Sequence, residues 1–129
     1  MDIFKPILLK FWKITEKNDE KRIASQTPTH GITQITDIPY IDDSMKEHLL
    51  DIYYPENTTE KLPVIVDIHG GGWLYGYKEI NKYYCLKLAE RGFLVASINY
   101  RLARNFQFID QIADAFSAFS WLFENLKNY

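Results

Sequence analysis

The sequence predicts an α/β fold, because strand-length and helix-length apolar patterns alternate along its second half. Val64–Ile68 and Phe93–Ile98 are nearly continuous apolar runs, which is typical of strands covered on both faces of a sheet. A helical pattern follows each run after a short joint, which indicates a βαβ unit with a parallel strand pair and a right-handed crossover. The chain has 129 residues, 47% of them hydrophobic, which is enough for one core but not for two domains.

The first residues predict an amphipathic helix over 3–17. Lysines separate apolar residues that recur at helical spacing, namely Ile3, Phe4, Ile7, Leu8, Phe11 and Trp12. Pro6 is compatible with this helix because it falls in the first turns. The polar segment 18–31, which contains Pro28, is typical of a connection. We therefore divide the chain into an N-terminal helix with its connection, 1–31, and an α/β unit, 32–129.

Two strands are expected next, over Ile32–Tyr40 and His48–Tyr54. The first segment is rich in Ile and Thr, and the second alternates apolar residues on its two faces. A turn signal, Asp42-Asp43-Ser44, lies between them. The pattern predicts an antiparallel hairpin with one face buried.

Two helices are expected in the α/β unit. The first spans Glu79–Arg91, and Gly92 after it is the C-terminal stop. Its apolar stripe consists of Ile80, Tyr84, Cys85, Leu88 and Ala89. The second runs from about Ile109 to Leu126. Spacings of four and three, those of one helix face, separate its apolar residues Ile112, Phe116, Phe119, Phe123 and Leu126.

Composition excludes several classes of protein. Lys plus Arg is 15 against 17 for Asp plus Glu, a formal charge of −2, so there is no basic footprint for nucleic acid. The apolar runs are shorter than the ~18 residues of a membrane span. The only cysteine, Cys85, cannot form an internal disulfide. Because Asp2 and Lys10 interrupt the N-terminal segment, it does not resemble a secretory signal, and we expect a cytoplasmic protein.

The segment that carries chemistry is His69-Gly70-Gly71-Gly72-Trp73, directly after the first buried strand. Consecutive glycines permit backbone conformations closed to other residues and let a ligand approach closely. Backbone N–H groups exposed in such a turn stabilise an oxyanion, at about 3–4 kcal/mol for each donor in acyl transfer. Bare glycines also make simple tight turns, but the strand and the flanking His69 and Trp73 favour the oxyanion function.

Pro63–Trp73 resembles the oxyanion-hole segment of α/β-hydrolase-fold carboxylesterases and lipases of the hormone-sensitive-lipase-like group. Asn99–Ala103 resembles the Y-R-L-A segment of that family. Gln111–Ala115 and Trp121-Leu122 resemble its helix leading towards the nucleophile. The resemblance covers about residues 32–129. It implies the N-terminal half of an α/β-hydrolase fold, a β-hairpin followed by βαβα, with an added N-terminal helix.

The resemblance also implies residue roles. The backbone N–H groups of Gly71 and Gly72 correspond to the oxyanion donors. The supporting residues would brace the loop, organise the adjacent wall and hold the following turn, and they are His69, Gly70, Trp73, Tyr100, Arg101 and Asp114. His69 is not implied to be the catalytic base, and no cofactor or metal is expected. The family usually continues Y-R-L-A with Pro-Glu, whereas Arg104-Asn105 follow here, so the next loop departs from the pattern.

The nucleophile motif of this fold, G-x-S-x-G, is absent from the sequence. Glycines flank none of its serines, which are Ser25, Ser44, Ser97, Ser117 and Ser120. We therefore expect the chain to supply the oxyanion hole but not the nucleophile, acid or base of a serine carboxylesterase that hydrolyses a small ester through an acyl-enzyme. Alone it is expected to be inactive.

In the family the Val64–Ile68 strand pairs with the nucleophile strand, so here its outer edge is expected to be open. This predicts self-association or pairing with the missing C-terminal half. The alternative is a non-catalytic or split-enzyme module that binds a partner through this edge. Amide or formamide hydrolysis on the same fold is a third possibility.

Other candidate residues favour structural interpretations. His30 and His48 have no carboxylate or cysteine at ligand spacing and are expected to be surface or packing residues. Cys85 is expected in the core. Asp51 and Asp67 are expected to bond backbone at strand edges or ends, in preference to forming an acid–base pair. The tyrosines after Trp73 either line a pocket or pack. The N-terminal helix is expected to cap the active-site mouth, with membrane contact and a structural role as alternatives.

Overall fold

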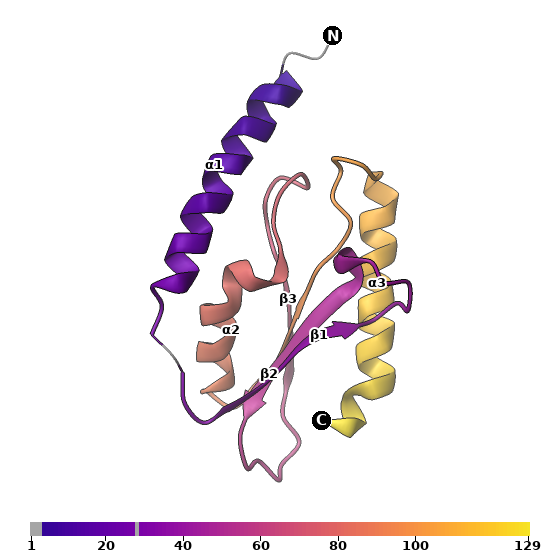
Figure 1. The fold of residues 1–129 in the computed structure, drawn as a ribbon. Helices are drawn as coiled ribbons and strands as arrows, with labels where there is room; N and C mark the ends of the chain where they lie inside the picture. Colours follow the sequence, from indigo (N-terminus) through magenta and orange to yellow (C-terminus); the bar gives the residue numbers. More distant parts are fainter. Residues whose placement is uncertain (1–3, 28) are drawn as a thin grey trace.

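The computed structural model describes residues 4–27 and 29–129, in which four strands form one open sheet between helices (Figure 1). The strands are β1 (Ile32–Pro39), β2 (Leu49–Pro55), β3 (Val64–Ile68) and β4 (Leu94–Ile98). The helices are α1 (Phe4–Ala24), α2 (Lys82–Ala89) and α3 (Phe108–Asn125), with short 3₁₀ turns at Lys46–His48, Lys78–Asn81 and Leu126–Asn128. The α/β prediction is confirmed.

The spatial order of the strands is β1-β2-β4-β3. The first two strands pair antiparallel as the predicted hairpin, with a register shift between Ile35 and Ile38 where Asp37 has a φ of +59°. The expectation of one buried face is wrong for β2, which is buried on both faces from Leu50 to Tyr53 because it lies inside the sheet. β4 lies between β2, to which it is antiparallel, and β3, to which it is parallel. The sheet therefore ends at β3, and among the described residues β3 pairs with β4 alone.

The two faces of the sheet are covered by different helices because strand residues alternate between faces. Leu50 and Ile52 of β2 share a core with Ala118 and Leu122 of α3. On the opposite face, the core around α2 contains Tyr53, Val95, Cys85, Leu86 and Ala89. Cys85 is fully buried there, as expected.

The expectation that Val64–Ile68 is covered on both faces is wrong at both ends of the strand. Val64 and Ile68 are exposed, whereas every residue of β4 is buried. The two strands have similar apolar sequences, so the difference comes from position: β4 is central and β3 is at the edge. The open outer edge of β3 agrees with the sequence expectation.

Of the apolar stripe predicted for the last helix, only Leu126 packs against the core. Ile112, Phe116, Phe119 and Phe123 are exposed, and the buried residues of the helix are Gln111, Asp114, Ala118 and Leu122. The polar members of this inner face have hydrogen-bond partners on distant segments, which allows their burial. The helix begins with a capping box in which the Gln107 backbone N–H donates to Asp110.

The two other helices differ from their predicted bounds. α1 is seven residues longer than expected at its C-terminal end, where Arg22 pairs with Asp19 one turn earlier. Of the segments predicted above, Ile3 and Pro28 lie outside the described residues. α2 begins only at Lys82, after a 3₁₀ turn, and Tyr84 of its expected stripe is exposed. Within the described range, no helix is long and apolar enough to cross a bilayer.

Candidate oxyanion site

The glycine loop leaves β3 at His69 and turns sharply over the next four residues. Gly71 and Gly72 have φ values of +135° and +58°, and Trp73 follows at +62°. The carbonyl of Gly71 accepts hydrogen bonds from the N–H groups of Leu74 and Tyr75, at 3.3 and 3.1 Å. A Cβ on Gly71 would overlap the carbonyl oxygen of Tyr75, so this position requires glycine for space as well as for conformation.

Beside this turn lies a mainly apolar cavity of about 390 Å³. It is lined on one side by the loop residues from His69 to Trp73, and on the other by Ile68, Tyr100, Phe108, Gln111, Ile112 and Ala115. In the part of the chain that the structure describes, neither the Gly71 nor the Gly72 N–H donates to a protein acceptor. Backbone donors without protein acceptors at the wall of an apolar cavity can stabilise an anionic oxygen.

His69 is buried behind the loop and braces it. Its ring stacks on Tyr100 with centroids 4.4 Å apart, and the Tyr100 hydroxyl donates to the His69 carbonyl at 2.8 Å. Its Nδ1 lies 3.0 Å from the carbonyl oxygen of Gly70. Burial lowers the pKa of His69 below its ordinary value of 6.5, which favours the neutral ring. No carboxylate among the described side chains hydrogen-bonds His69 to make it a base.

Trp73 lies at the lip of the cavity, 60% exposed, with its ring edge-on to Phe108 at 6.2 Å. Its carbonyl accepts from the Ala103 N–H at 2.8 Å and from Gln111 Nε2 at 3.0 Å. Arg104 Nε donates to the next carbonyl, that of Leu74, at 2.6 Å. Sequence reasoning missed Gln111 as a loop contact. The sequence offered no signal for this contact, because Gln111 falls outside the predicted apolar stripe of the helix.

Arg101 and Asp114 lie next to this site and bind each other. Asp114 is fully buried and accepts from the Arg101 N–H at 2.8 Å and from its guanidinium at 2.6 Å. His48 Nε2 lies 3.2 Å from Asp114, and its Nδ1 lies 2.6 Å from Asp43. His48 is buried, in agreement with the packing interpretation. Its two carboxylate partners were not expected, because Asp114 is distant in the sequence and Asp43 lies across a turn.

The remaining candidates lie away from the cavity. Burial raises the pKa of the Cys85 thiol to about 12, which disfavours a reactive thiolate. Asp51 accepts from the backbone N–H of Asp37, as expected, and also pairs with Lys78. Asp67 accepts from the side chains of Asn81 and Ser97. Among the described residues, no serine lines the cavity and no cluster of His, Cys, Asp and Glu is arranged to hold a metal.

The N-terminal helix contacts the loop from outside. Trp12 stacks on Tyr75 with centroids 4.9 Å apart and rings 7° from parallel. The Tyr75 hydroxyl donates to Asp19 at 2.7 Å. A Cβ on Gly72 would lie 3.5 Å from the Trp12 ring, so α1 reaches the oxyanion turn itself.

Comparisons with known proteins identify the family. A family model described as BD-FAE matches residues 50–129. The chain is 35% identical over 80 residues to a probable isoprenylcysteine alpha-carbonyl methylesterase of Arabidopsis thaliana, a match that covers 62% of this chain and 17% of that protein. It is also 35% identical over 94 residues to the arylacetamide deacetylase of Bos taurus, covering 68% of this chain and 24% of that protein.

The fold has close counterparts among solved structures. Esterase B from Lactobacillus rhamnosis superposes with a TM-score of 0.86 at 31% identity, over 91% of this chain and 38% of that one. A bacterial heroin esterase, 24% identical, shares the fold with a TM-score of 0.77, over 94% of this chain and 38% of that one. The chain thus spans less than half of the length of each relative. It belongs to the BD-FAE family and has the N-terminal portion of the α/β-hydrolase fold of carboxylesterases.

Proposed function

We propose that this chain forms the oxyanion hole of a carboxylic-ester hydrolase that acts through a serine acyl-enzyme. The observation that carries the proposal is the pair of backbone N–H groups at Gly71 and Gly72, which lack protein acceptors within the described residues and line the apolar cavity. As an acyl-transfer transition state develops negative charge on its carbonyl oxygen, two such donors stabilise it without reorganisation.

The apolar lining of the cavity favours a small ester with a hydrocarbon acyl or alcohol group. Ile68, Phe108 and Ile112 supply this lining next to the glycine turn. The esterase B relative has been crystallised with a tributyrin phosphonate inhibitor, a mimic of an ester's tetrahedral intermediate. Since G-x-S-x-G is absent from this sequence, the nucleophile, acid and base are expected from another part of the fold.

The test is a chimera in which this chain replaces the matching N-terminal 38% of esterase B from Lactobacillus rhamnosis. We expect the chimera to hydrolyse p-nitrophenyl butyrate and to be labelled by a fluorophosphonate, and the 129-residue chain alone to do neither. A chimera that folds, as judged by circular dichroism, yet neither turns over esters nor is labelled would contradict the proposal.

A matched pair of glycine variants in the chimera tests the oxyanion role. Gly71→Ala places a methyl against the Tyr75 carbonyl, so the turn must move, and we expect kcat to fall by about 10²–10³ with little change in KM. Gly92→Ala also strains a positive φ, of +91°, but it lies after α2 and does not line the cavity, so its kcat is expected to stay near wild type. Equal kcat in the two variants would exclude the oxyanion role.

A second function, association through the open side of the sheet, is favoured by the exposed apolar surface there. The exposed ends of β3 and the outer stripe of α3 both lie on this side, where Ile68 and Ile112 border the same cavity. Because an unpaired strand edge beside apolar surface binds another chain readily, we propose the remaining part of a hydrolase fold as its occupant. Tight binding of the esterase B remainder without labelling would support a non-catalytic module.

A further inference from the structure

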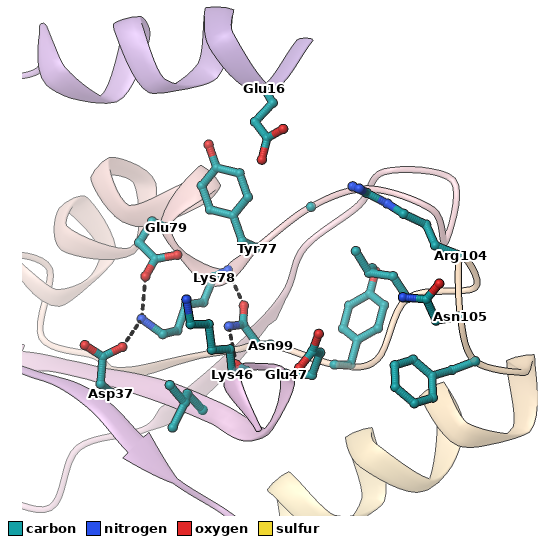
Figure 2. Close-up of a pocket in the computed structure, with 15 residues that line it drawn as sticks. Glu16, Asp37, Lys46, Glu47, Tyr77, Lys78, Glu79, Asn99, Arg104 and Asn105 are labelled. Carbon is teal, nitrogen blue, oxygen red and sulfur yellow. Dashed lines mark hydrogen bonds and ion pairs between the residues drawn. The ribbon is translucent and has the colours of Figure 1, made fainter. Parts of the chain in front are cut away.

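The glycine loop lies between two cavities. Its first half lines the apolar cavity described above. Its second half, Gly76 and Tyr77, lines a polar cavity of about 640 Å³ with Lys78, Asn99 and others, shown in Figure 2. Tyr100 borders both cavities. Contacts to Trp73, Leu74 and Tyr75 hold the middle of the loop, and a separate anchor holds its C-terminal end.

The anchor at the C-terminal end is Lys78, whose side chain is only 2% exposed. In the described part of the chain its ammonium pairs with three carboxylates: Asp51 at 2.8 Å, Asp37 at 2.9 Å, and the neighbouring Glu79. Figure 2 shows Asp37 and Glu79 converging on Nζ from two sides. Burial opposes the charge, but the hydrogen bonds to the carboxylates outweigh it and raise the pKa of Lys78 above its ordinary value.

Asp51 joins this cluster to the hairpin. It is buried in β2, accepts from the Tyr53 hydroxyl at 2.8 Å, and accepts from the Asp37 N–H at 2.9 Å where β1 shifts register. The lysine therefore connects the end of the loop to both β1 and β2. In other proteins, a buried ion pair can often be replaced by apolar residues without loss of stability. The stability of the fold therefore does not by itself explain the Lys78–Asp51 pair.

Backbone contacts hold the same position. The Lys78 N–H donates to Asn99 Oδ1 at 2.7 Å, and Ser97 Oγ donates to the Lys78 carbonyl at 2.8 Å (Figure 2 shows the first). Two residues earlier, a Cβ on Gly76 would overlap the His69 ring and crowd the Gly70 carbonyl. Gly76 is thus pressed against the back of the oxyanion turn, and a shift at Lys78 reaches Gly70 through it.

We propose that Lys78 is a positioning residue, whose buried ammonium fixes the end of the glycine loop and thereby the directions of the Gly71 and Gly72 N–H groups. The catalytic meaning of this role rests on the proposed function. The order of the loop can be measured without ester turnover. If Lys78→Met loosens the loop but the chimera is inactive, the positioning role stands and only the esterase proposal fails.

The experiment is amide hydrogen exchange by NMR on the full chain, comparing Leu74 and Tyr75, whose N–H groups donate to the Gly71 carbonyl, with Val95 and Ala96 of β4. Lys78→Met is expected to accelerate exchange in the loop about tenfold relative to β4. Leu122→Ala, a control in the core on the other sheet face, is expected to destabilise the whole chain without raising this ratio, because core strands exchange through global unfolding.

Removing Lys78 also leaves the buried Asp51 carboxylate without its ion-pair partner, and two further variants separate this cost from the loss of the positioning role. Lys78→Met with Asp51→Asn leaves no unpaired carboxylate at position 51, so global stability should recover while the loop stays loose. Asp37→Asn keeps a residue that tolerates the positive φ and is expected to raise the ratio about twofold. An unchanged ratio across this series would overturn the proposal, as would wild-type loop exchange in the double variant.

Discussion

The inner and outer faces of α3 reverse the usual arrangement of a surface helix. The inner face buries Gln111 and Asp114 together with Ala118 and Leu122, while the outer face exposes aromatic rings, of which Phe123 is 91% exposed. β4 and β3 differ in the same way, since similar apolar runs are buried in one and half-exposed in the other. Burial in this chain is therefore set by which partners are present, and apolar character alone does not predict it.

The largest effect is expected on the polar inner face. Asp114→Ala should lower the free energy of unfolding by about 3–5 kcal/mol, because it removes the buried partner of Arg101 and His48. Urea denaturation measures this. Glu90→Ala, which breaks an exposed pair with Lys87, is the control and should cost less than about 1 kcal/mol. A loss for Asp114→Ala no greater than that of the control would show that the inner face does not depend on its polar network.

A smaller effect is expected from the apolar side chains of the same helix. Leu122→Ala leaves a cavity under the sheet and should cost about 2–5 kcal/mol. Phe123→Ala, one residue away on the outer face, should change stability by no more than about 0.5 kcal/mol. Thermal or urea unfolding of the pair tests the comparison directly, and similar losses would mean that the outer face is covered in solution.

Acid is expected to weaken the site behind the glycine loop. The pKa of His69 is lowered by burial in the folded chain, so the unfolded chain binds more protons, and stability present above pH 6.5 is lost as the pH falls below it. The free energy of unfolding between pH 7.5 and 5 measures this loss. His69→Phe should flatten the slope, whereas the exposed control His30→Gln should retain it. If the free energy of unfolding of His69→Phe depends on pH as strongly as that of the wild type, His69 is not the source of the acid sensitivity.

The smallest effect on the free energy of unfolding is expected on the exposed face of α3, although self-association should depend on this face. Phe116→Lys with Phe119→Lys alters only exposed side chains, so unfolding should shift by about 0.5 kcal/mol or less. The same change places charge on the apolar face beside β3 and should lower self-association in sedimentation velocity. Ala113→Lys with Ser120→Lys, two exposed positions of the same helix, is the charge-matched control. If sedimentation of Phe116→Lys with Phe119→Lys is unchanged, the association surface does not include this face of α3.

Local patterns predicted most of the fold. The hairpin, the parallel pair β3–β4 and the stop at Gly92, whose φ is +91°, follow from alternation, apolar runs and glycine placement, all of which act over a few residues. The outward stripe of α3 could not be predicted, because its inner polar residues depend on the Trp73 carbonyl and on Arg101, which are distant in the chain.

In the candidate site too, contiguous motifs could be predicted and contacts between distant segments could not. The glycine turn was visible in the sequence because its motif is contiguous. The Lys78 cluster was not, since it joins positions 37, 51, 78 and 79 across three segments, and no spacing rule connects them. The ring of Trp12 on Tyr75 was missed for the same reason.

The exposed ring of Trp73 gives the chain an optical reporter. Of the three tryptophans, Trp12 stacks on Tyr75 and Trp121 is half-buried near the C-terminus, while Trp73 stands at the mouth of the apolar cavity. An apolar molecule that enters the cavity removes water from this ring, and indole emission moves to shorter wavelength in a drier environment. In a variant with Trp12 and Trp121 replaced by phenylalanine, titration with a short ester would report occupancy through fluorescence, before any bond is broken.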